Sequence, residues 1–329
     1  MRLRSGVAID LGTVNTLVYV AGRGVVIDEP TAIAISRETG EVVSVGLPAD
    51  ALTGKEPQGI DVVHPLREGV IADLDATVAM LQAFVRRAQV RRRLAKTVAV
   101  VSLPVEATDV EQRSLVAAAA SLRPRCVVRL VEEPVAAAAG SGIDLLAGSG
   151  AFVVDIGGGT TDIAVLAGGH LVRARSLRLG GDAMDDAVAR AVRNEHGLLI
   201  GRNAARTLKM TLGLGDGTLA EAETVGVDAA ERTPRTQRVS ASLVAEAVEP
   251  TVATIIATVR ELLSDIPPNL AEEVVRSKIR LSGGGALLPG LAYRLEASAD
   301  IATMVVEDPR RCVIRGAAQI LERGTGGPS

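Results

Sequence analysis

Residues 7–20 read VAIDLGTVNTLVYV, and residues 152–166 read FVVDIGGGTTDIAVL. Each stretch is an apolar run, then Asp, an aliphatic residue and Gly, then a turn that contains Thr, then a second apolar run. This order is typical of a β-hairpin with Gly and Thr at its tip and Asp at the end of its first strand. The two copies lie about 145 residues apart, close to half of the 329-residue chain, so we expect two lobes of similar design.

The tips of both hairpins have the composition of a phosphate-binding turn. Glycine lets backbone N–H groups approach an anion, and a neighbouring hydroxyl adds a donor. An Asp beside phosphate favours a hydrated Mg²⁺ between them, although a single Asp is equally well explained as a turn cap. The predicted phosphate-binding residues are Gly12, Thr13 and Asn15 in the first hairpin and Gly157, Gly158, Gly159, Thr160 and Thr161 in the second, and the predicted Mg²⁺ ligands, acting through water, are Asp10 and Asp155.

A third glycine-rich element, IRLSGGGALLPGL, occupies residues 279–291. It predicts a strand, a glycine turn and a helix, and a nucleoside could lie against the backbone of Gly283, Gly284 and Gly285. A tight strand-to-helix turn explains the same glycines. Other familiar motifs are absent from the sequence: there is no GxxxxGK[ST], no GxSxG and no cluster of His residues.

Strand-like and helix-like runs alternate along the whole chain, which predicts an α/β fold. Aromatic residues make up 1% of the chain, with no Trp, which excludes base-stacking platforms and an aromatic membrane belt. The net charge of −3 provides no global basic field for nucleic acid. Two distant cysteines and the absence of a signal peptide or long apolar span predict a soluble intracellular protein.

Six stretches, in this order, resemble the MreB-like bacterial actins, which belong to the superfamily of actin, sugar kinases and heat-shock chaperone ATPases. The resemblance implies an actin-like fold with two lobes, each a mixed sheet flanked by helices with a small inserted subdomain, and a nucleotide cleft between them. Lobe I is expected at residues 1–139 and 313–329, with its subdomain at about 28–62, and lobe II at 140–312, with its subdomain at about 178–248. The stretches are residues 7–20, 62–73 (VVHPLREGVIAD), 131–142 (VEEPVAAAAGSG), 153–166, 179–188 (LGGDAMDDAV) and 281–291.

The resemblance further implies that the protein binds ATP (or GTP) with Mg²⁺ and polymerises into filaments at the inner face of the cytoplasmic membrane. There it would help membrane proteins of morphogenesis to organise cell-wall synthesis, with slow ATP hydrolysis coupled to polymerisation. Glu133 would orient the attacking water, with Thr160 or Thr161 near the same water. A carboxylate at a helix start, followed by Pro134, explains Glu133 equally simply.

The chain departs from the family pattern in two places. Asp162 stands where Glu is usual, and residues 200–209 read IGRNAARTLK where IGExTAExIK is usual, with acidic side chains near the ribose and adenine. Arg202 and Arg206 therefore reverse the charge at two positions of the implied nucleoside site, while Lys209 remains. The arginines could contact phosphate, stack on the base, or simply lie on a solvated face.

A local basic run, RRAQVRRRLAK, occupies residues 86–96. It predicts salt-sensitive attraction to an anionic membrane surface, and a solvated basic helix end is the alternative. Nucleic acid is not an expected partner, because the chain as a whole is acidic. Three rival functions remain open: a nucleotide-binding scaffold that has lost hydrolysis, a small-molecule kinase, and a chaperone. The chaperone is disfavoured because the chain ends about 40 residues after Gly285.

Overall fold

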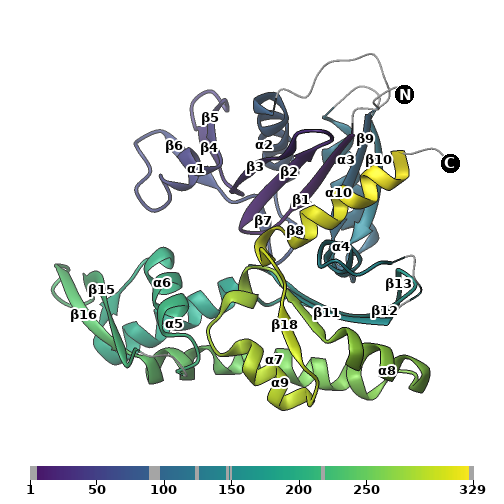
Figure 1. The fold of residues 1–329 in the computed structure, drawn as a ribbon. Coiled ribbons are helices and arrows are strands. Elements are labelled where there is room, and N and C mark those ends of the chain that lie inside the picture. Colours follow the sequence, from purple (N-terminus) through teal and green to yellow (C-terminus); the bar gives the residue numbers. More distant parts are fainter. Residues whose placement is uncertain are drawn as a thin grey trace. The chain divides into compact units, whose positions relative to one another are not determined.

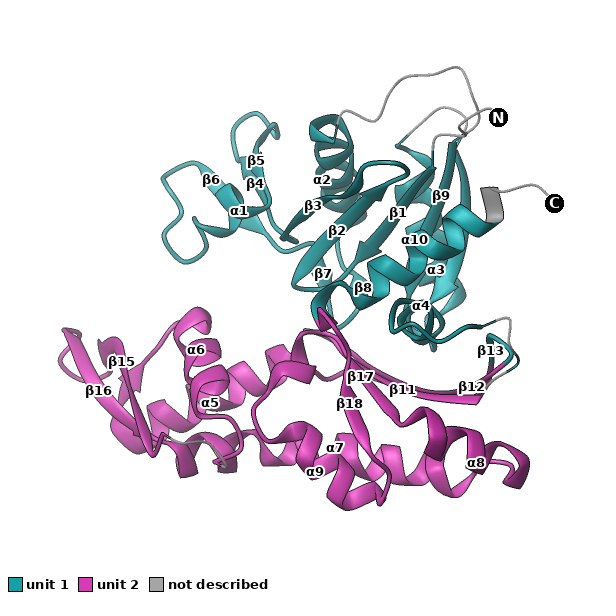
Figure 2. Cartoon of the chain, viewed as in Figure 1, with its two compact units in different colours: residues 1–148, 168–170, 310–329 teal, residues 149–167, 171–309 magenta. Residues whose placement is uncertain are grey.

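The structure is a computed structural model that describes residues 6–88, 97–122, 126–145, 148, 150–215 and 219–325. The chain divides into two compact units (Figure 2). Unit 1 comprises Met1–Gly148, Gly168–His170 and Arg310–Ser329, and unit 2 comprises Ser149–Ala167 and Leu171–Pro309. Each unit is built around its own five-stranded sheet and its own apolar core.

The sheet of unit 1 has the strand order β10-β9-β1-β2-β3 (Figure 1). β1 pairs antiparallel with β2 and parallel with β9, which confirms the hairpin predicted at residues 7–20. Alternate residues of β1, such as Val7 and Ile9, enter a core with α2 and α3. The strands are β1 (Gly6–Leu11), β2 (Asn15–Val20), β3 (Gly24–Pro30), β9 (Thr97–Leu103) and β10 (Cys126–Glu132), and the helices are α2 (Leu74–Arg87) and α3 (Asp109–Ala120).

Two crossing helices, α4 (Glu133–Gly140) and α10 (Cys312–Thr325), also belong to unit 1. α10 runs along β1 and β9, on the face opposite Val7 and Ile9, where Gly6 leaves room for Leu321 (Figure 1). The helices touch backbone to backbone at two glycines. A Cβ on Gly316 would lie 1.7 Å from the Ala136 carbonyl oxygen, and a Cβ on Gly140 would lie 2.0 Å from that of Cys312. Neither position therefore accepts a side chain without moving the helices apart.

Unit 1 also carries a small three-stranded sheet of order β5-β4-β6, accompanied by the short helix α1. A separate two-stranded hairpin, β7–β8, turns at Glu68 and Gly69, which both have positive φ. The bounds are β4 (Ile33–Ser36), β5 (Val42–Val45), α1 (Leu47–Asp50), β6 (Ile60–Val63), β7 (Leu66–Arg67) and β8 (Val70–Ile71).

The sheet of unit 2 repeats the plan of unit 1, with the order β13-β12-β11-β17-β18. β11 pairs antiparallel with β12 and parallel with β17, as β1 does with β2 and β9. The hairpin predicted at residues 152–166 is therefore confirmed, together with the internal repeat. The strands are β11 (Gly150–Ile156), β12 (Thr161–Ala167), β13 (His170–Leu177), β17 (Ile279–Ser282) and β18 (Thr303–Val305).

Helices cover the core of unit 2. α5 ends at His196, and Gly197 follows as its C-cap in the left-handed backbone conformation (φ 61°) that favours glycine. Within the described residues, α7 is the one helix long and apolar enough to span a membrane, but its Val244, Val248 and Ile255 side chains are buried in this core. The helices are α5 (Gly181–His196), α6 (Arg202–Leu212), α7 (Ala241–Ser264), α8 (Pro268–Ser277), η1 (Gly284–Leu287) and α9 (Leu291–Ala299), and a small sheet holds β14 (Leu198–Leu199), β15 (Glu221–Asp228) and β16 (Pro234–Ser240).

Candidate functional site

The turn of the β1–β2 hairpin is held from several sides. The Gly12 N–H donates to the Asn15 carbonyl oxygen (3.1 Å), and the Thr31 hydroxyl donates to the Gly12 carbonyl oxygen (2.7 Å). The Thr13 hydroxyl accepts the Gly69 N–H (2.9 Å) from the tip of the β7–β8 hairpin. A Cβ on Gly12 would lie 2.9 Å from the Asn15 carbonyl oxygen, so this turn requires glycine at its first position.

The turn of the β11–β12 hairpin closes in the same way. The Gly157 N–H donates to the Thr160 carbonyl oxygen (2.9 Å), which matches the bond between Gly12 and Asn15. Here, however, the N-terminal end of α5 lies directly against the turn. The Gly181 N–H donates to the Gly157 carbonyl oxygen (3.0 Å), and the Asp182 N–H donates to the Gly158 carbonyl oxygen (2.9 Å). The first N–H groups of α5 thus hold the turn.

The residues around this turn leave little space. A Cβ on Gly180 would lie 2.6 Å from the Gly157 carbonyl oxygen, so glycine is required just before α5. Thr161 is fully buried, and its hydroxyl donates to the Leu179 carbonyl oxygen (2.8 Å). Thr160, by contrast, lies within the turn itself. Of the two threonines predicted near the attacking water, Thr161 already has a structural hydrogen bond.

Each predicted Mg²⁺ ligand accepts a hydrogen bond from a serine on the neighbouring parallel strand. The Ser102 hydroxyl donates to Asp10 Oδ1 (2.9 Å), and the Ser282 hydroxyl donates to Asp155 Oδ1 (2.5 Å). Ser102 lies near the end of β9, and Ser282 is the last residue of β17. The internal repeat therefore extends to a Ser–Asp pair in each unit, which the sequence analysis missed. The sequence feature that could have indicated these pairs is a serine at the end of an apolar run, in VVSLP and in IRLSG.

Burial raises the pKa of Asp10 to about 6, with a smaller contribution from the nearby Asp28 carboxylate and an opposing one from the Ser102 hydrogen bond. Ionised Asp10 is therefore held at a free-energy cost, and a bound cation would offset that cost. Each of these carboxylates is an oxygen ligand of the kind that a hydrated Mg²⁺ takes, since that ion binds few carboxylates and keeps several waters.

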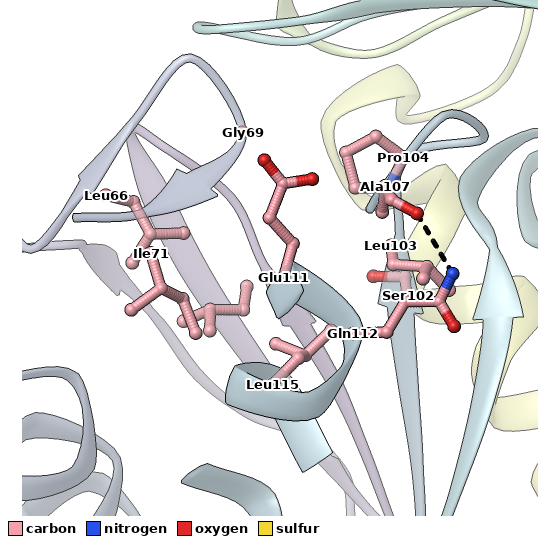
Figure 3. Close-up of a pocket in the computed structure, with 11 residues that line it drawn as sticks. Leu66, Gly69, Ile71, Ser102, Leu103, Pro104, Ala107, Glu111, Gln112 and Leu115 are labelled. Atoms are coloured by element: carbon pink, nitrogen blue, oxygen red, sulfur yellow. Dashed lines mark hydrogen bonds between the residues drawn. The ribbon is translucent and has the colours of Figure 1, made fainter. Parts of the chain in front are cut away.

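A small cavity in unit 1 adjoins the first turn (Figure 3). Its wall is largely apolar and includes Leu11, Ile71 and Leu115, and Ser102 also borders it. Gln112 at its edge donates through Nε2 to the Ala107 carbonyl oxygen (2.9 Å). Ser102 is the hydrogen-bond partner of Asp10. The apolar side chains next to Ser102 therefore agree with the burial that raises the pKa of Asp10.

Glu133 is the first residue of α4 and follows β10 directly. Its side chain is half-buried, whereas the preceding Glu132 is exposed. Pro134 follows in the first turn of the helix, as the sequence predicted. The structure therefore places Glu133 at a helix N-terminus, where a carboxylate is favourable, and distinguishes it from its neighbour by burial.

The third glycine element is a strand followed by a 3₁₀ helix, and α9 begins only at Leu291. Gly283 has φ 79°, and a Cβ there would lie 2.2 Å from the Ile156 carbonyl oxygen. A Cβ on Gly285 would lie 2.2 Å from Ile156 Cγ2. These glycines let the backbone pack on the end of β11, beside the second turn. A structural reason for them thus exists alongside the predicted nucleoside contact.

The cations of α6 pair with carboxylates of α5. Lys209 Nζ lies 2.6 Å from Asp185 Oδ1, and Arg206 lies 3.0 Å from Asp185 and 3.3 Å from Asp182. The Arg202 guanidinium lies 3.8 Å from Asp182 and 3.7 Å from Asp186. We call this group the α5–α6 ion network; its members are Asp182, Asp185, Asp186, Arg202, Arg206 and Lys209.

The network contains three carboxylates and three cations, so its formal charges cancel. The two arginines that stand where the family pattern has acidic residues therefore have carboxylate partners within the protein. Burial raises the pKa of Asp182, although Arg202 and Arg206 oppose that shift. The sequence alone did not decide the role of Arg202 and Arg206, because their partners lie on another helix. The spacing of LGGDAMDDAV, with Asp at i, i+3 and i+4, was the available signal.

Arg87 is the one member of the basic run at residues 86–96 with a partner in the described structure. It forms a bidentate ion pair with Glu29 and lies over the Phe84 ring, 5.8 Å from its centroid. Arg86 is exposed. Residues 89–96, which carry most of the predicted membrane contact, lie outside the described residues.

Comparisons with known proteins agree with these features. The chain matches the family model of the MreB/Mbl protein over residues 4–326. It is 36% identical over 318 residues to the cell shape-determining protein Mbl of Bacillus subtilis (96% of this chain, 95% of the relative), and 38% identical over 323 residues to the cell shape-determining protein MreB of Escherichia coli (96% and 92%).

Solved structures give the same result. MreB5 of Spiroplasma citri bound to AMPPNP aligns with a TM-score of 0.90 and 30% identity, covering 98% of this chain and 97% of that chain. The MamK double helical filament aligns with a TM-score of 0.82 at 24% identity, covering 97% and 99%, and supports the fold alone. The predicted actin-like fold is confirmed, and the chain belongs to the MreB/Mbl family.

Proposed function

We propose that this protein is a filament-forming, ATP-binding bacterial actin that hydrolyses ATP slowly with Mg²⁺. It would act as a cytoskeletal element in the cytoplasm, at the inner face of the membrane, and would help morphogenesis proteins to organise cell-wall synthesis. The observation that carries the proposal is the repeated turn. In each unit a glycine-initiated hairpin turn lies beside an Asp that a serine holds in place.

A solved relative supports nucleotide binding. MreB5 of Spiroplasma citri has been crystallised with AMPPNP and with ADP, at 30% identity over nearly the whole chain. The curated Mbl and MreB relatives are cell shape-determining proteins, and they support the proposed role in morphogenesis.

In the proposed reaction the residues of the chain bind and orient. The backbone N–H groups of both turns would hold the phosphates, and Mg²⁺, when bound, would neutralise charge on them. Asp10 and Asp155 would hold the waters of the ion. Glu133 would accept a hydrogen bond from the attacking water and so orient it towards the γ-phosphate. Catalysis would therefore consist mainly of positioning and charge stabilisation.

A paired substitution at the start of α4 tests hydrolysis. We expect Glu133→Ala to lower phosphate release by about 100-fold, the usual range for removing a general base or a water-orienting group. The exposed neighbour Glu132→Ala should retain the wild-type rate. Phosphate release and ATP-dependent pelleting would be measured on the same samples. Equal rates for the two variants would refute the assigned role of Glu133.

The same measurements separate the rival functions. A scaffold without hydrolysis would pellet with ATP but release no phosphate in the wild type. The α5–α6 ion network keeps this candidate open, because Arg202 and Arg206 occupy positions that are acidic in the family pattern. Phosphate release that requires an added sugar would indicate a small-molecule kinase instead.

A further inference from the structure

The α5–α6 ion network consists of an inner and an outer part. Asp185 is fully buried, and the Lys209 side chain is only 6% exposed, so the inner pair is shielded from water. The Arg202 side chain is 55% exposed, and its closest carboxylate oxygens are 3.7 and 3.8 Å away. Exposed ion pairs contribute little, whereas removing one partner of a buried pair is costly. The structural effect of the network therefore lies with Lys209, Arg206 and their partners.

The inner cations contact the two residues that hold the second turn. Lys209 Nζ donates to the Gly181 carbonyl oxygen (2.9 Å), and the Arg206 guanidinium donates to Asp182 Oδ1 (3.3 Å). The N–H groups of these same residues, Gly181 and Asp182, donate to the carbonyl oxygens of the turn. A continuous chain of hydrogen bonds thus runs from α6 through the start of α5 to the turn.

This chain of bonds sets the direction of the turn's donors. The Gly157 and Gly158 carbonyl groups point towards α5, because they accept its first N–H groups. In a planar trans peptide the N–H of the next residue points the opposite way. The N–H groups of Gly158 and Gly159 therefore point away from α5, as two neighbouring donors suited to an anion.

We propose that Arg206 and Lys209 are positioning residues for this turn. Acting through Asp182 and Gly181, they hold the Gly158 and Gly159 N–H groups in the orientation that binds the phosphate chain of a nucleoside triphosphate. Their contacts in the structure are with Asp185, Asp182 and the Gly181 carbonyl oxygen, so the role assigned to them is indirect. The inference rests on the proposed nucleotide binding, and it names the residues that orient the part of the site that would hold the phosphates.

Isothermal titration of the full-length protein with AMPPNP and with adenosine tests the inference. The variants are Arg206→Gln and Lys209→Gln, with Arg190→Gln as the matched control, because Arg190 is an exposed arginine of α5. We expect AMPPNP affinity to fall about tenfold in both test variants, as misplacement of binding groups does. Adenosine affinity should change less than about twofold, and Arg206→Lys should recover only part of the loss, because one ammonium does not reproduce the two contacts of the guanidinium with Asp185 and Asp182.

Amide hydrogen exchange of the nucleotide-free protein provides a second readout. Exchange at Gly181 and Asp182 should be faster in Arg206→Gln and Lys209→Gln, and unchanged in Arg190→Gln. Unchanged AMPPNP affinity, or an equal loss for AMPPNP and adenosine, would overturn the inference. If the wild type binds neither ligand, the proposed function fails, and exchange at these two amides alone decides the positioning role. If Lys209→Gln does not fold, the half-exposed Arg206 decides it.

Discussion

The two aspartates that are next to last in β1 and β11 show how far single residues could be interpreted from sequence. Asp10 and Asp155 were predicted because each precedes a glycine turn in a recognisable hairpin. Their serine partners were missed because they lie 92 and 127 residues away, on strands whose pairing only the fold reveals. Local patterns thus identify the acidic residue, and long-range strand pairing supplies the residue that orients it.

The raised pKa of Asp10 makes a prediction about stability. A folded-state pKa of about 6, above the ordinary value of 3.8, means that the folded protein favours the protonated form. Stability from this group is present below about pH 4 and is lost as pH rises through 6. Asp10→Asn, whose side chain can still accept from Ser102, should therefore stabilise the nucleotide-free protein at pH 7.5 by about 3 kcal/mol.

Thermal unfolding of the nucleotide-free protein at pH 7.5 and pH 4.5 would measure this effect. The gain should be smaller at pH 4.5, where Asp10 is largely protonated. The same variant should bind AMPPNP with Mg²⁺ more weakly, because it lacks the carboxylate. Asp265→Asn, at an exposed position, is the control. A variant no more stable than wild type at pH 7.5 would contradict the proposed cost of ionising Asp10.

At the scale of elements, the alternation of helices and strands and the two hairpins followed from sequence, but the contacts between elements did not. IGRNAARTLK identifies a helix, yet nothing in it indicates that Lys209 reaches Asp185 or that Arg206 pairs with α5. The predicted strand–turn–helix at residues 279–291 contains a 3₁₀ helix, because Gly283 and Gly285 pack on Ile156. Tertiary packing decided both details.

The crossing of α4 and α10 gives a prediction at this scale. Gly316 lies inside α10, where alanine would gain about 1 kcal/mol of helix propensity. Its Cβ, however, would lie 1.7 Å from the Ala136 carbonyl oxygen, and overpacking of this kind costs about 1–3 kcal/mol or more. Because both partners are backbone, we expect the clash to outweigh propensity. Gly316→Ala should lower the free energy of unfolding, as denaturant titration would measure.

An exposed position of the same helix supplies the comparison. Gln319→Ala in α10 changes helix propensity slightly and meets no neighbouring backbone, so its free energy of unfolding should stay within about 0.5 kcal/mol of wild type. If Gly316→Ala were as stable as Gln319→Ala, the two helices would have to separate without cost, which would refute the tight crossing.

At the scale of the molecule, both units use one plan: an antiparallel hairpin, a parallel strand beside its first strand, and a serine on that strand facing the hairpin's Asp. The sequence revealed this plan through a single internal repeat. The repeat itself did not indicate which remote segments complete each unit; only the family resemblance implied that residues 313–329 belong to lobe I, and unit 1 includes Arg310–Ser329. Those additions depend on packing of α10 against β1 and β9, which no local pattern encodes.

The effect of the basic run at residues 86–96 is a property of the whole molecule, since attraction to a membrane depends on the sum of many charges. Arg87 is engaged with Glu29, so the attraction must come mainly from the other basic residues of the run. Each Lys or Arg near an anionic surface contributes about 1 kcal/mol, and many subunits in a filament multiply the effect. Binding should therefore weaken steeply as salt rises, because salt screens exposed charges.

Liposome flotation with ATP-assembled protein would measure this binding. Replacing Arg91, Arg92 and Arg93 by Gln should reduce binding to anionic vesicles at least about tenfold at low salt, because it removes about 3 kcal/mol of attraction per subunit. The matched control replaces three exposed arginines of unit 2, Arg173, Arg175 and Arg190, and changes the net charge equally. Neutral vesicles should bind neither protein. Equal losses in the two triple variants would mean that net charge alone drives attachment, and binding to neutral vesicles would mean that apolar insertion does.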